Sequence, residues 1–119
     1  MAWSFTSDRA VYVQIAERIT SSILAEEYVP GEQLPTVRQL AMEAAVNPNT
    51  VQRAFSELEH DGIIVSRGTL GRFVTEDEEI IRSCRMKQAK HLAETYVQAM
   101  QQLSMTKEQA ISMIKEVEE

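Results

Sequence analysis

Residues 34–55 constrain the fold most, because two helix signatures follow each other there with little between them. The stretch reads LPTVRQLAMEAAVNPNTVQRAF. Leu34-Pro35 closes a loop, and Thr36 is placed to cap a helix, with Gln39 at the spacing of a capping box. Apolar residues then recur at helical spacing and give one narrow face: Val37, Leu40, Ala41 and Ala44. This pattern predicts a short helix that ends before Val46.

A second helix is predicted immediately afterwards. Asn47 is a good N-cap, and Pro48 loses nothing at a first helical position, where the N–H has no partner. The inner face is apolar: Val51, Ala54, Phe55 and Leu58. The residues left pointing outward are polar: Asn49, Thr50, Gln52, Arg53 and Ser56. A short helix, a turn and a second helix with a polar outer face is the arrangement that places a recognition helix in a DNA major groove.

The flanking segments complete a small domain. Ser7 or Asp8 can cap a first helix that runs to about Glu27 and carries an apolar stripe. After the central helices, residues 63–65 and 73–75 read as two short strands around a glycine-bearing turn. This hairpin would carry Arg67 and Arg72 near its tip. Three helices and a basic-tipped hairpin predict a winged helix, so the fold class is mainly α with a small β-hairpin.

The last third of the chain reads as two helices. The first runs from about residue 80 to 103, and Thr106 with Gln109 forms a capping box for the second. Two helices cannot bury both of their apolar faces in one copy, so we expect a homodimer. The expected dimerisation residues are Leu92, Tyr96, Ala99, Met100, Leu103, Ile111 and Ile114. The predicted domains are therefore residues 1–75, the winged helix, and residues 76–119, a dimerisation region.

Charge and composition limit the kinds of function. A net charge of −6 argues against a nonspecific nucleic-acid coat, but a specific binder needs only a local basic surface. Residues 1–75 contain six arginines and no lysine. An arginine side chain can bind phosphate or guanine through two parallel hydrogen bonds. A preference for arginine over lysine among so few residues can also arise by chance.

Other classes of function find little support. The sequence contains no Ser/His/Asp grouping, no phosphate-binding loop and no paired acids, so we expect no enzyme and no cofactor. His60, Cys84 and His91 are the soft ligands, and two on one helix make no dedicated metal site. One cysteine, no bilayer-length apolar run and no leader predict a cytoplasmic protein without membrane contact.

Residues 30–74 resemble the N-terminal DNA-binding domain of the GntR family of bacterial transcription regulators. The matching motifs are Pro30-Gly31, Leu34-Pro35-Thr36-Val37-Arg38, Leu40-Ala41, Asn47-Pro48-Asn49-Thr50-Val51, Arg67-Gly68 and Phe73-Val74. The short tail resembles the YtrA-type subfamily, which has only a pair of dimerising helices at this position. Members of that subfamily commonly act as repressors beside transporter operons, which is what the resemblance implies here.

The resemblance also bears on individual residues. Arg38 corresponds to a DNA-contacting arginine, and Arg67 and Gly68 take the wing positions that enter the minor groove. Arg72 stands where a small residue is usual, and is either a phosphate contact or a solvated charge. The family often has a basic residue at the positions of Pro48 and Gln52, so we expect an unusual operator.

The expected DNA-binding residues are Arg38, Asn47, Asn49, Thr50, Gln52, Arg53, Arg67, Gly68 and Arg72. Of Gln52 and Arg53, one is expected to contact DNA and the other to pair with Glu57 or Glu59. The resulting hypothesis is a homodimeric repressor that binds double-stranded DNA at an inverted repeat.

One alternative is a protein-interaction module without DNA binding. This hypothesis is favoured if acidic residues such as Glu43 and Glu57 neutralise the positive potential around the arginines. A weaker one is a sensor with a ligand cavity at the dimer interface. The sequence does not identify a small-molecule effector.

Overall fold

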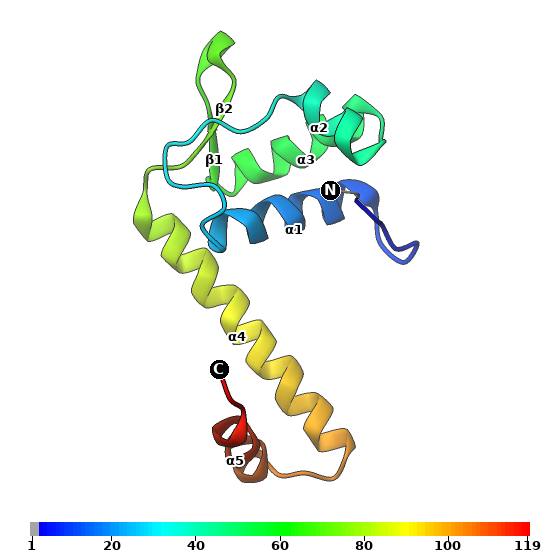
Figure 1. Cartoon of the computed structure of the whole chain (residues 1–119), viewed down its shortest axis with the longest axis vertical. Helices are drawn as coiled ribbons and strands as arrows, with labels where there is room; N and C mark the ends of the chain where they lie inside the picture. Colours follow the sequence, from blue (N-terminus) through cyan, green and yellow to red (C-terminus); the bar gives the residue numbers. More distant parts are fainter. Residues whose placement is uncertain (1–2) are drawn as a thin grey trace. The chain divides into compact units, whose positions relative to one another are not determined.

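The computed structural model describes residues 3–119 and is mainly helical, with one two-stranded antiparallel sheet (Figure 1). This confirms the expected fold class. The described residues form two compact units, the first ending at Arg82 and the second spanning Ser83–Glu119. The first unit thus extends beyond residue 75, where the sequence placed the boundary.

The first unit is built around three helices. They are α1 (Val11–Leu24), α2 (Val37–Ala44) and α3 (Pro48–His60), and α3 packs against both of the others. The core residues come from all three: Ile15, Ile19, Ile23, Leu40, Ala41, Ala44, Val51, Ala54, Phe55 and Leu58. Phe55 is the largest of the fully buried side chains, so α3 is fixed by burial on its inner face.

The connection between α2 and α3 follows the sequence signals. Thr36 and Gln39 form the capping box of α2, and the Asn47 side chain accepts the Asn49 N–H at the start of α3. Ala45 adopts a left-handed conformation, with φ of 57°, where α2 ends. These local contacts confirm the predicted pair of helices and hold the turn between them short.

The first helix is shorter than expected. It begins at Val11 after an N-cap, Ala10, that makes no side-chain cap, and it ends at Leu24 rather than Glu27. Asp8 does not cap it, because its carboxylate accepts the hydroxyl of Thr6 instead. That hydrogen bond is the main reason why the pKa of Asp8 is lowered.

The hairpin, called the wing below, comprises β1 (Ile64–Ser66), β2 (Arg72–Val74) and a short 3₁₀ turn, η1 (Gly68–Leu70). Both strands lie one residue away from their predicted positions, with Val65 paired to Phe73. The α1–α2 loop runs along β2: the Leu34 N–H donates to the Arg72 carbonyl at 2.8 Å, and the Val74 N–H donates to the Glu32 carbonyl at 2.9 Å. The wing is therefore held on its outer edge.

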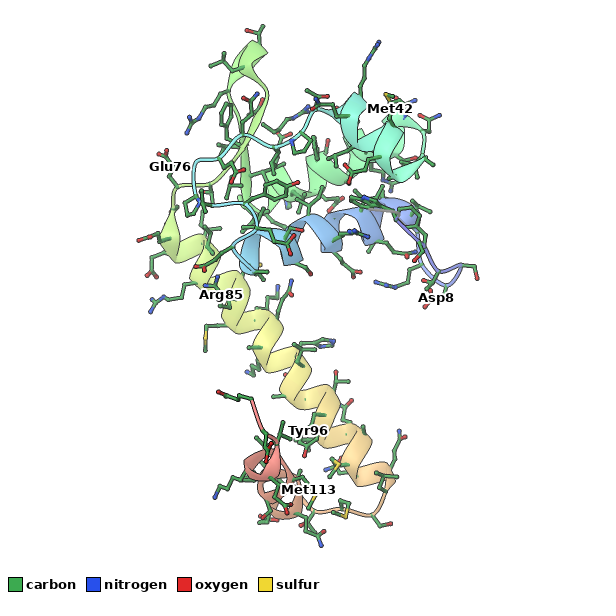
Figure 2. The ribbon with its side chains drawn as sticks, in the orientation of Figure 1. Asp8, Met42, Glu76, Arg85, Tyr96 and Met113 are labelled. Atoms are coloured by element: carbon green, nitrogen blue, oxygen red, sulfur yellow. The ribbon has the colours of Figure 1, made fainter. Side chains whose placement is uncertain are left out.

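The second unit contains most of α4 (Glu78–Gln102) and all of α5 (Lys107–Glu116). The predicted Thr106–Gln109 capping box is present. The Tyr96 hydroxyl donates to the Ala110 carbonyl at 2.7 Å, and Tyr96 points towards α5 (Figure 2). Ala110 is the only buried residue of α5, so this unit has almost no core of its own.

Among residues 3–119, no helix is both long enough and apolar enough to cross a membrane.

Candidate nucleic-acid interface

Arg38 lies in the first turn of α2 and is exposed. Within the part of the chain that the structure describes, no ion pair involves its guanidinium. No carboxylate among these residues competes for it, and the bidentate geometry of the guanidinium suits phosphate.

The start of α3 supplies a cluster of polar groups. The Asn47 Oδ1 is occupied by the Asn49 N–H at 2.7 Å, which leaves the Asn47 amide nitrogen as a donor. Asn49 and Gln52 are exposed, and Thr50 is half-buried. The sequence-predicted residues of the recognition helix are thus brought together at its N-terminal end, where a helix that enters a major groove contacts base edges.

An open, mostly apolar depression of about 500 Å³ lies beside this cluster. It is lined by Arg38, Ala41, Met42, Val46 and Pro48. Met42 is 84% exposed and points outward from α2 (Figure 2). Sequence reasoning missed this feature, although an apolar Met42 outside the buried stripe of α2 was a signal for it.

Arg53 is held against α1. Its guanidinium lies 3.9 Å from the centroid of the Tyr12 ring and donates to the Tyr12 hydroxyl at 3.3 Å. Of the two residues considered for a pairing with Glu57 or Glu59, Arg53 makes no ion pair with either within residues 3–119. A stacked guanidinium keeps donors at its edge, so Arg53 is positioned rather than freely solvated.

Arg72 is neither at the wing tip nor solvated, which corrects the expectation. It lies in β2, and its Nε is 3.1 Å from Glu59 Oε1 in α3. The guanidinium also lies 5.3 Å from the centre of the Phe55 ring. Both partners of the ion pair are more than two-thirds buried, so Arg72 fastens the wing to α3.

The wing tip consists of Arg67 and the glycine after it. Arg67 lies 4.6 Å from the Phe73 ring centre and 3.6 Å from Glu76, in an exposed pair that costs little to open. Gly68 has a φ of +57° and open space around the position of a Cβ. A Gln33 side-chain amide donates to the Leu70 carbonyl at 2.5 Å and fixes the turn.

The acidic residues named as possible neutralisers are placed differently from one another. Glu43 accepts the indole N–H of Trp3 at 3.4 Å, so it lies on the side of α2 that faces the segment before α1. Burial, followed by Glu43 and two other carboxylates, raises the pKa of Tyr28. Glu43 therefore belongs to another side of the unit from Arg38. Glu57 is exposed and makes no ion pair within residues 3–119.

Among the described residues, no group of three or more His, Cys, Asp or Glu side chains could hold a metal ion. The described residues therefore form a helix pair with polar side chains at the start of α3, an arginine, Arg38, that has no ion pair among them, and a wing with Arg67 at its tip. This geometry defines the class of winged-helix DNA-binding proteins.

Comparison with known proteins identifies the family within this class. Residues 11–74 match the family described as bacterial regulatory proteins, gntR family. The uncharacterized HTH-type transcriptional regulator YhcF of Bacillus subtilis is 39% identical over 93% of this chain and 92% of that protein. The HTH-type transcriptional repressor YtrA of the same organism is 38% identical over 60% of this chain and 55% of that protein.

Solved structures agree. A GntR family transcriptional regulator from Listeria monocytogenes has a TM-score of 0.88 and 37% identity, covering 96% of this chain and all of that one. The DNA-binding domain of AraR in complex with operator ORX1 has a TM-score of 0.56 and 25% identity, covering 63% and 95%. The chain belongs to the GntR family: it is a transcription regulator with a DNA-binding winged helix, and it is not an enzyme.

Proposed function

We propose that the protein is a homodimeric repressor that binds an inverted-repeat operator in the cytoplasm. The observation that carries the proposal is the first turn of α3, where polar side chains gather beside Arg38, which has no ion pair within residues 3–119. Each protomer would insert α3 into a major groove and bring the tip of the wing to the adjacent minor groove.

The proposed contacts have different tasks. Arg38 binds phosphate and sets the position of the helix, whereas Asn47, Asn49, Thr50 and Gln52 contact base edges. Arg67 and Gly68 form the minor-groove contact after Arg67 leaves Glu76. Arg53 adds a phosphate contact from its stacked position on Tyr12, and Arg72 acts indirectly by holding the wing.

The dimer is proposed from the second unit. Its apolar side chains remain exposed in one copy, among them Leu92 at 67%, Leu103 at 71% and Ile114 at 55%. The ten-residue α5 is too short to be stable without packing, and only Ala110 is buried. A second copy would cover these side chains, as well as Tyr96, Ala99, Met100 and Ile111.

The repressor role rests on similarity to a relative named as a repressor. A target operator beside transporter genes rests on the resemblance of the C-terminal tail to the YtrA-type subfamily. Two-fold symmetry places the half-sites at least about 34 Å apart, one turn of the double helix. The test is a gel-shift titration at moderate salt with the DNA upstream of the protein's own gene. Retardation at concentrations at least 10³-fold below those needed for random DNA supports the proposal; equal retardation of both contradicts it.

One observation favours the rival function, a protein-interaction module without DNA binding. The arginines of the wing are both near carboxylates, Arg67 near Glu76 and Arg72 near Glu59. The same titration separates the two functions, since an interaction module would show no preference for any DNA.

A further inference from the structure

We propose that the apolar depression on α2 and α3 is a reader of thymine methyl groups, and that it determines part of the operator sequence. This inference rests on the proposed DNA-binding function. For brevity, the side chains of Met42, Val46 and Pro48 are called the methyl reader.

The methyl reader adjoins Asn47 and Asn49, because Pro48 is the first residue of α3 and Val46 lies in the turn before it. A recognition helix contacts base edges with its N-terminal residues, and Pro48 is exposed at the first position of α3. Pro48 has no side-chain donor or acceptor, so it can contribute to sequence readout only through an apolar contact.

Thymine alone presents a methyl group in the major groove, and apolar side chains recognise it by contact. The depression offers an apolar surface that a methyl group can contact. Met42 lines it and is 84% exposed although it is large and apolar. Methionine is flexible, so it can adapt to a methyl group without a rigid pocket.

Arg38 lines the same depression and carries no ion pair within residues 3–119. Arg38 and Met42 are four residues apart in α2 and therefore lie on one side of that helix. An occupant with an anionic backbone beside apolar groups fits this pairing, and a DNA strand that carries thymine has both.

The experiment begins with selection of bound DNA from a random pool by the full chain. Each thymine of the selected half-site is then replaced by deoxyuridine, which lacks only the methyl group, and the dissociation constant is measured. We expect one or more thymines at which loss of the methyl group weakens binding about fourfold. This is the change in dissociation constant that corresponds to the burial of one carbon atom.

Two variants locate the effect. Met42→Gln and Pro48→Ser are expected to bind thymine and deoxyuridine equally at those positions. Val29→Thr is the matched control, since Val29 is exposed in the α1–α2 loop, and it should keep the fourfold ratio. Thermal melting followed by circular dichroism checks that each variant is folded.

The outcomes are distinct. Wild-type protein that binds every deoxyuridine site as tightly as the thymine site would overturn the inference and leave the proposed function intact. Variants that retain the fourfold ratio would overturn the assignment to Met42 and Pro48. Selection that enriches no sequence would remove the proposed function, and the methyl reader with it.

Discussion

The two units of the chain bury their apolar residues to very different degrees. In the first unit, α1, α2 and α3 all contribute to one core, and Phe55 has no exposed surface. In the second unit, large apolar side chains such as Leu103 and Ile114 remain exposed, although the helices are equally regular. Regular local structure and a sufficient core are therefore separate properties: the first unit has both, whereas the second has regular helices and almost no core of its own.

The largest expected effect comes from removing the centre of the first core. Phe55→Ala should lower the free energy of unfolding by about 3–5 kcal/mol, because it leaves a cavity and loses a buried ring. Urea denaturation followed by circular dichroism measures the change. A loss below about 1 kcal/mol would mean that the first unit is not organised around α3.

The second unit should respond in the opposite way. Leu103→Glu combined with Ile114→Glu should leave the first unit folded but weaken the dimer by about 3 kcal/mol, because each protomer would bring two charges into the interface. Analytical ultracentrifugation measures the dissociation constant. Gln98→Glu, an exposed polar position on the same α4, is the control and should change it little. Equal dimerisation of all three proteins would contradict the proposed interface.

A smaller effect is expected at the DNA contact of the first unit. Arg38→Ala should weaken binding about tenfold on all sequences, as expected for one lost charge-assisted contact. It should also reduce the slope of log affinity against log salt by about 1. Arg82→Ala removes the same charge from an arginine paired with Glu79 and serves as the control. Identical salt slopes in the two variants would argue that Arg38 does not bind phosphate.

The smallest effect concerns the attachment of the wing. Glu59→Gln removes the charge that holds Arg72 and should destabilise the first unit by about 1 kcal/mol, given the partial exposure of both groups. Glu57→Gln is the control on the same helix, and we expect it to be neutral. Thermal unfolding monitors both variants, and a Glu57 effect as large as that of Glu59 would contradict the role of the ion pair.

What the sequence could predict depended on the range of the interactions involved. The capping boxes at Thr36 and Thr106 need only residues three positions apart, and both were predicted correctly. The start of α1 was wrong because Asp8 has a nearby competitor, Thr6, that no periodicity reveals.

The site was predictable to the same extent. The polar end of α3 follows from helical spacing. The stacking of Arg53 on Tyr12 joins residues 41 apart, and the Arg72–Glu59 pair joins two elements whose packing must be known first. Such contacts depend on how the helices and the wing come together, so composition and spacing did not find them.

The account depends most on the claim that the exposed residues of the second unit pair with a second copy. Size-exclusion chromatography with light scattering, at tens of micromolar and on the full chain, tests it directly. We expect twice the mass of one chain, and two chains bound to each selected DNA duplex. A single-chain mass at every concentration, with one chain on each duplex, would contradict the account.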